Sequence, residues 1–202
     1  MRVRLDDVEL SLDDGVIDGG HEAIYEEARK KARASRRVII DIIVDGESVG
    51  EEDAFFSLSG GLDIRFVTQP IRDLVSESMD EGKRYFVSLK QGLDSIATLF
   101  EESNVHDAQA KFAQAIDGIN WLLGVFDKSC LLLGVTSGSL RSGDYEKDLG
   151  DLNQALTELA SSMESGKTMS QAYLIREKLA PSIERFSVYW DEVAALLGAP
   201  LQ

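Results

Sequence analysis

The chain has 202 residues, of which 44% are hydrophobic and 28% charged, a balance typical of a folded globular protein and not of a disordered or fibrous one. Its 36 acidic residues exceed its 21 basic residues and give a formal net charge of −15. Because phosphate-rich surfaces are bound mainly through Lys and Arg, this charge disfavours DNA, RNA and anionic membranes as partners. The acidity indicates solubility or, as a second interpretation, attraction to a basic partner.

Three features of the sequence predict a cytoplasmic location. Cys130 is the single cysteine, so no disulfide can form within the chain. The first residues carry no apolar segment of the kind found in signal peptides, and no stretch approaches the roughly 20 apolar residues that span a membrane. Cys130 itself opens the apolar run 130–133, which favours a buried structural thiol over a nucleophile because apolar surroundings disfavour the thiolate.

Residues 1–69 change their pattern every few residues, which predicts a small α+β unit. Apolar residues alternate with polar ones at Val3, Leu5, Val8, Leu10 and Leu12, the pattern of a β-hairpin with one buried face. In chain order, the expected elements are this hairpin over 3–12, a loop over 13–20, a helix over 21–35, a strand over 36–44, a tight turn at 45–46, a short strand near 48–49, an irregular turn through 55–56 and a strand over 62–68.

This element order resembles that of the β-grasp, or ubiquitin-like, fold. The resemblance covers about the first third of the chain and rests on the order of elements and on the stretch IIDIIVDGESVGEEDAFFSLSGGLDIRFVT. Ubiquitin-like modifiers and sulfur carriers end in a free Gly-Gly tail, whereas here the last strand continues through Thr68, Gln69 and Pro70 into more protein. The resemblance therefore implies a module for protein contacts and does not imply conjugation or sulfur transfer.

From Pro70 onward the period of the apolar residues changes from two to about 3.5, which predicts helices. Pro70 suits a helix start, because its missing N–H costs nothing in a first turn. The apolar seams extend over residues 75–100, 105–133, 145–163 and 169–197. Short connections between them predict an up-down four-helix bundle. Pro181 lies inside the fourth helix, and because the seam keeps its phase there we expect a kink and not a break.

The predicted fold is therefore α+β: a small β-grasp-like domain over residues 1–69, followed by an antiparallel helical bundle over residues 70–202.

The second bundle helix, residues 105–133, has more apolar residues than one seam uses. Beside the seam lie Trp121, Val125 and Leu132, and Gly118 and Gly124 would let another backbone approach closely. Two interpretations stay open. In one, this helix is central and is wrapped by the rest of the protein. In the other, these five residues form an interface with a partner or with a second copy of the chain.

The sequence shows no recognisable active site, so we expect no catalytic residue, no cofactor and no metal. His21 and His106 fall in different predicted domains and do not form a metal-binding pair. The glycine-containing loop 15–20 lacks the phosphate-binding patterns, and no nucleophile elbow is present. Arg176, on the fourth seam, is interpreted as pairing with an acid or reaching solvent, with ligand binding as the alternative.

These observations predict a non-enzymatic protein-protein interaction protein, such as an adaptor, an assembly factor or a chaperone-like bundle. The expected partner is a protein or a second copy of the chain. Two alternatives remain: a homo-oligomeric structural protein, for example a homodimer through residues 105–133, and a small-ligand-binding protein or enzyme with its site between the two domains.

Overall fold

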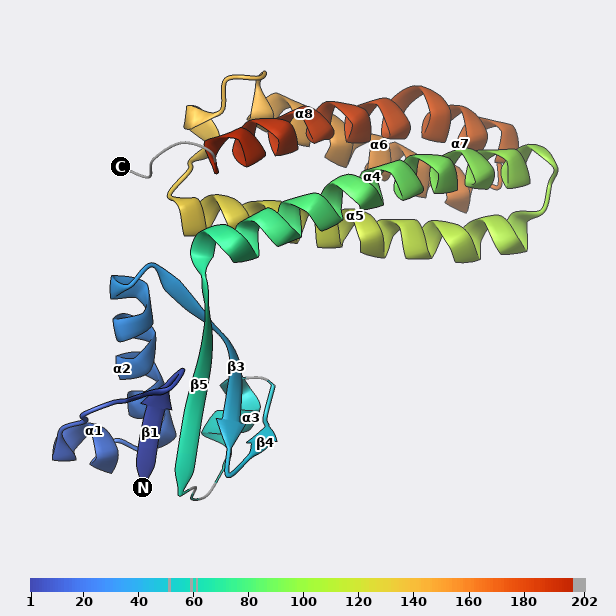
Figure 1. The fold of residues 1–202 in the computed structure, drawn as a ribbon. Helices are drawn as coiled ribbons and strands as arrows, with labels where there is room; N and C mark the ends of the chain where they lie inside the picture. The colour runs from blue at the N-terminus through green and yellow to red at the C-terminus, as the bar shows by residue number, and fades with distance from the viewer. Residues whose placement is uncertain (51, 59, 61, 198–202) are drawn as a thin grey trace. The chain divides into compact units, whose positions relative to one another are not determined.

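The computed structural model describes residues 1–50, 52–58, 60 and 62–197. The chain divides into two compact units, Met1–Leu74 and Val75–Gln202. A small mixed sheet with short helices makes up the first unit, and helices make up the described part of the second (Figure 1). The predicted α+β class is therefore confirmed.

Five strands form the sheet that the structure describes in the first unit, in the order β2-β1-β5-β3-β4. Strand β1 runs parallel to β5, and the other neighbours are antiparallel. The strands are β1 (Arg2–Leu5), β2 (Val8–Glu9), β3 (Arg37–Val44), β4 (Glu47–Ser48) and β5 (Asp63–Pro70). The five strands and helix α2 follow one another along the chain in the predicted order.

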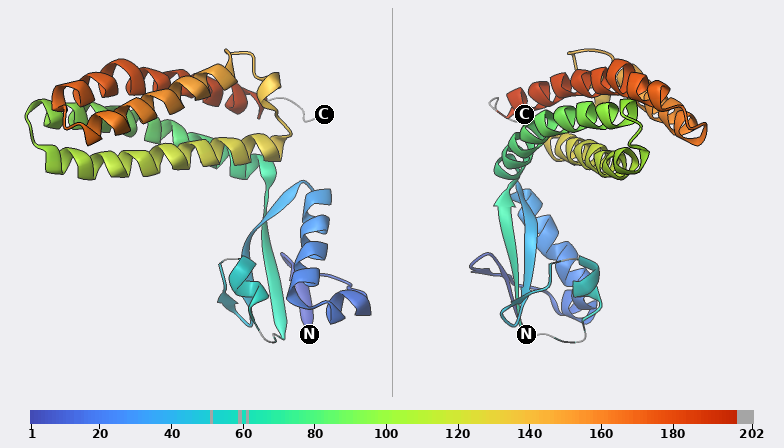
Figure 2. Two further views of the ribbon diagram at one scale, coloured as in Figure 1. Left: turned by 180° about the vertical axis from the view of Figure 1, so that it is seen from behind. Right: turned by 90° about the vertical axis from the view of Figure 1, so that its right-hand side faces the viewer.

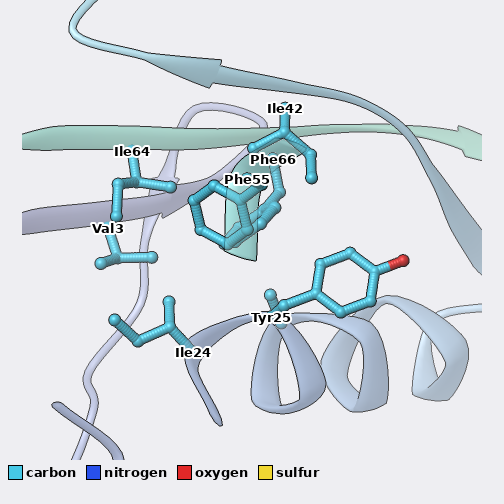
Figure 3. Close-up of a cluster of buried hydrophobic side chains, with 8 residues drawn as sticks. Val3, Ile24, Tyr25, Ile42, Phe55, Ile64 and Phe66 are labelled. Atoms are coloured by element: carbon cyan, nitrogen blue, oxygen red, sulfur yellow. The ribbon is translucent and has the colours of Figure 1, made fainter. Parts of the chain in front are cut away.

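The core of this unit lies between the sheet and helix α2 (Gly20–Ala34) (Figure 3). Ile24 and Tyr25 of α2 face apolar side chains of three strands and the ring of Phe55, which belongs to the short helix α3 (Glu52–Phe56). The rings of Phe55 and Phe66 meet edge to face with centroids 5.6 Å apart. Each fully buried side chain of this size contributes about 1.5–3 kcal/mol, so this cluster stabilises the packing of α2 against the sheet.

Several local predictions in this unit were wrong. The expected loop 13–20 contains a short helix, α1 (Asp14–Asp18), and the expected irregular turn at 55–56 is part of α3, which is held in place by buried Phe55. Val8, expected on the buried face of the hairpin, is 68% exposed because β2 is a two-residue edge strand. Strand β3 begins at Arg37 and not at residue 36, since Arg36 has φ 55° and cannot continue a strand.

Four helical rods make up the described part of the second unit, and neighbouring rods run in opposite directions (Figures 1 and 2). They are α4 (Ile71–Glu101), α5 (Val105–Leu133), α6 (Tyr145–Glu164) and a fourth rod composed of α7 (Thr168–Leu174), a π-helical turn (Ile175–Leu179) and α8 (Ala180–Leu196). A 3-10 turn, Ser137–Ser139, lies in the α5–α6 connection. The predicted up-down bundle is confirmed, although Pro70 ends β5 and α4 begins one residue later.

All residues of the predicted α4 seam, from Val75 to Phe100, are buried, and Ala97 is buried in addition. At Gly82 the ring of fully buried Trp190 from α8 comes so close to the helix that an added Cβ would overlap it. The seams therefore fit together through large rings placed over small residues, as close packing requires. No helix in the described part of the chain is long and apolar enough to cross a membrane.

The fourth rod stays helical past Pro181, and its irregularity lies in the preceding turn. Proline lacks an N–H group, and its ring clashes with the carbonyl group four residues earlier, here that of Glu177. Glu177 lies within the π-helical turn Ile175–Leu179, where the wider backbone makes room for the ring.

Candidate interaction groove

Helix α5 packs against α4 through a tyrosine placed over a glycine. Gly118 of α5 is buried, and an added Cβ there would overlap the ring and hydroxyl group of Tyr85 from α4. One turn along α5, Trp121 meets Tyr85 edge to face, with ring centroids 5.4 Å apart and an interplanar angle of 70°. The close approach expected at Gly118 is therefore made by a ring of the same chain.

An open hollow of about 610 Å³ lies between α4 and α5 at this position, and its lining includes Glu81, Arg84, Tyr85, Asp117 and Trp121. A second hollow of about 320 Å³ shares Tyr85 with it and extends along the same two helices to Lys111. Together they form what we call the α4–α5 groove. Trp121 is 38% exposed, so part of its ring is accessible in the groove.

The structure brings together two of the five residues predicted as an interface. Gly118 and Trp121 line the groove. Val125, Leu132 and Gly124 are half-buried and do not line it, and Gly124 has open space where a side chain would be. The second helix is thus packed against its neighbours along its seam and leaves one aromatic residue accessible at the α4 side.

Sequence reasoning missed the residues that α4 contributes to the groove. Tyr85, Glu81 and Arg84 lie beside the α4 seam, and the period of apolar residues assigns such positions to the surface. Only the pairing of Tyr85 with Gly118 places them opposite Trp121. Because this contact is between two helices, the sequence pattern of neither helix predicts it.

Charged side chains line the groove beside the two rings. Among residues 1–50, 52–58, 60 and 62–197, the side chains of Glu81, Arg84 and Asp117 make no ion pair or hydrogen bond. The hollow between α4 and α8, about 240 Å³, is different, because Lys83 pairs with Asp191 at 2.8 Å and Lys90 with Glu184 at 3.0 Å across it.

The side chain of Arg176 binds acidic and polar groups of α4 within the bundle. From the π-helical turn its guanidinium donates to Asp94 and to Thr98 of α4, at 3.0 Å each, and to the carboxylate of Glu101. These hydrogen bonds, that to Asp94 first, raise the pKa of Arg176. The ion-pair interpretation is therefore confirmed, and the guanidinium serves to hold the fourth rod against α4.

The residues of interest for chemistry do not converge. Burial, helped by the negative charge of Asp127, raises the pKa of the half-buried Cys130 thiol to about 11. His21 lies against the ring of Phe55 in the first unit, with centroids 4.7 Å apart, whereas His106 lies at the start of α5. In the part of the chain that the structure describes, no group of three or more His, Cys, Asp or Glu residues could hold a metal ion.

Comparison with known proteins gives a match to residues of the helical bundle only. A family model described as "Domain of unknown function (DUF8042)" matches residues 77–188, a range that includes both walls of the α4–α5 groove. No curated protein and no solved structure matches the chain. The β-grasp resemblance of the first unit therefore stays a prediction.

Proposed function

This chain belongs to the family of the domain of unknown function DUF8042, and we propose that its bundle is a non-enzymatic protein-interaction domain that binds a partner in the α4–α5 groove. The observation that carries the proposal is the accessible Trp121, held edge to face against Tyr85 in an open groove. Trp and Tyr are enriched among the residues that dominate the energetics of protein interfaces, and they bury a large area at low entropic cost.

The charges in the groove support the same proposal. Glu81, Arg84 and Asp117, which have no partner among the described residues, line the same hollow as the ring pair, whereas two ion pairs lie across the α4–α8 hollow. An interface of the usual kind combines an aromatic centre with a polar rim, which is the arrangement here. The proposed partner is a protein in the cytoplasm, since the net charge of −15 disfavours nucleic acids and anionic membranes and the lone cysteine gives no disulfide.

Site-specific photo-crosslinking in cells tests this function. A photoreactive residue at Ser88 or Gln114 would lie in the groove, whereas one at exposed Ser161 of α6 would lie outside it. We expect one dominant protein adduct from the groove positions, absent at Ser161 and lost when Trp121→Ser is added to a chain that remains folded by circular dichroism. Equal adducts at all three positions, or none at the groove, would contradict the proposal.

A homo-oligomer formed through α5 is the second candidate, favoured by Leu131, which is 80% exposed. It predicts that the mass measured by sedimentation rises with protein concentration and that Leu131→Lys keeps the chain monomeric. A wild-type chain that stays monomeric at high concentration removes this candidate and leaves the first untouched.

A further inference from the structure

We propose that the end of the α4–α5 groove containing Tyr85 and Trp121 is a pocket for a cationic side chain, arginine or lysine, so that the segment bound there is basic. The inference rests on the proposed function and names the chemistry of its partner. It combines two kinds of group in one hollow of about 610 Å³: aromatic rings and unpaired carboxylates.

The two rings provide surfaces that attract a cation. Tyr85 and Trp121 meet at 70°, so they line the hollow in two different planes. The faces of Trp and Tyr carry negative charge density, and a guanidinium or ammonium group over them gains about 0.5–1 kcal/mol at an exposed site. A neutral apolar side chain would gain from ring contact but not from this electrostatic attraction.

The carboxylates lie close to the rings by helix geometry. Glu81 precedes Tyr85 by four residues on α4, and Asp117 precedes Trp121 by four residues on α5. Long side chains on a helix point back towards its N-terminus, so each ring leans over the turn that carries the acid. Glu81 and Asp117 line the same hollow as the rings, and neither has a partner among the described residues.

Arg84 restricts the charge pattern of the segment that can bind in the pocket. It lines the same hollow and has no ion pair within the described residues. A basic side chain seated between the carboxylates would be repelled by Arg84 unless the bound segment also offers it an acid. A basic segment that also carries one acidic residue for Arg84 therefore fits better than an all-basic one, and its remaining positive charge is attracted by the −15 charge of the chain.

A second copy of this chain is a poor occupant. Two copies carry a net charge of −15 each and repel one another, and in the densest basic run, on α2, Arg29 pairs with Glu26 at 2.9 Å and Lys30 and Lys31 with Glu27 at 3.7 and 4.0 Å. The structure therefore favours a different protein as the source of the basic segment.

The two tryptophans make a direct test available, because Trp190 is fully buried and Trp121 is accessible. The full chain, labelled with ¹⁵N, would be titrated with N-acetyl-arginine N-methylamide and, separately, with its neutral isostere N-acetyl-citrulline N-methylamide. We expect the Trp121 indole N–H resonance to move with the arginine probe in the millimolar range, at least about threefold more tightly than with citrulline, while the Trp190 resonance stays in place.

Conservative variants show which groups act. Asp117→Asn and Glu81→Gln should each weaken binding of the arginine probe about two- to fivefold, the effect of one exposed charge pair, and Arg84→Gln should strengthen it. Glu102→Gln, an exposed carboxylate outside the groove, is the matched control and should change nothing. Equal binding of arginine and citrulline, no movement of Trp121, or insensitivity to both carboxylate variants would each overturn the inference.

The two proposals can fail separately. If photo-crosslinking finds a groove partner but the arginine and citrulline probes bind equally, the groove function stands and the cation pocket is wrong. If the arginine probe binds selectively but the groove positions give no adduct, the pocket stands and the partner-binding function is wrong.

Discussion

Two glycines of α5 lie six residues apart in very different surroundings. Gly118 is buried under the ring of Tyr85, whereas Gly124 has no atom within 4 Å of the place where a Cβ would be. In an isolated helix both would cost about 1 kcal/mol relative to alanine. Only Gly118 is required by packing. Substitutions at the two positions therefore distinguish the helix-propensity cost of glycine from the stability gained by the close contact with Tyr85.

Gly118→Ala should lower the free energy of unfolding by about 1–3 kcal/mol, because the methyl group forces Tyr85 out of its place. Gly124→Ala is the matched control and should raise it by up to about 1 kcal/mol through helix propensity. Urea denaturation followed by circular dichroism measures both. If Gly118→Ala proved as stabilising as Gly124→Ala, the tyrosine contact described for the groove would be absent.

Cys130 should react slowly with iodoacetamide at neutral pH, because burial holds its thiol pKa at about 11 and only the thiolate is a good nucleophile. The rate of alkylation should keep rising beyond pH 10 and reach the level of an exposed cysteine only in urea. Asp127→Asn should lower the pKa slightly, since its negative charge is the smaller cause. An inflection near pH 8.5 in the folded chain would show an accessible thiol.

At the scale of elements, the long helices were predictable and the short ones were not. The α4 seam, residues 75–100, extends over about seven turns, so the period appears many times in the sequence. Helices α1 and α3 have five residues each, too few for a period, and α3 exists because Phe55 enters the sheet core. Trp121 was found from the sequence as surplus apolar surface, whereas Glu81 and Arg84 depend on a contact between helices.

The α5–α6 connection is held to α8 by a single carboxylate. Glu192 accepts hydrogen bonds from the backbone N–H groups of Arg141 and Ser142, at 2.7 and 2.9 Å. Hydrogen bonding, that of the Ser142 side chain first, lowers the pKa of Glu192 below its ordinary value of 4.5. A group with a lowered folded pKa stabilises the fold above its unfolded pKa and loses that effect as the pH falls through the folded pKa.

Glu192→Gln should therefore destabilise the chain at neutral pH and make little difference in strong acid. Measured in urea from about pH 7 to pH 3, the wild-type and variant stability curves should converge at the acid end. Glu164→Gln, a substitution at an exposed carboxylate of α6, serves as the comparison. Parallel wild-type and Glu192→Gln curves would mean that the carboxylate does not hold the connection.

At the scale of the whole molecule, the excess of acidic residues destabilises the folded state through charge repulsion. The chain carries 36 acidic and 21 basic residues, and like charges on a compact surface repel one another. Several exposed ion pairs, such as Lys83–Asp191, offset little of this because exposed pairs are worth about 0–1 kcal/mol each.

Moderate salt should thus raise the melting temperature, since screening acts more on the surplus repulsion than on the short ion pairs. The increase should appear between low ionic strength and about 0.15 M NaCl, and equally with KCl, when followed by differential scanning calorimetry. A melting temperature that falls with salt would show that the ion pairs dominate instead.

The boundary between the two units falls inside a helix, between Leu74 and Val75 of α4, and β5 passes into that helix at Ile71 without a linker. The Ile71 N–H group donates to the Arg36 carbonyl group of the first unit. Expressing the two units as separate chains would therefore cut helix α4. The second unit would then begin with a helix terminus whose backbone N–H groups have no capping partner. An engineer who wants the bundle alone must design a new cap for it.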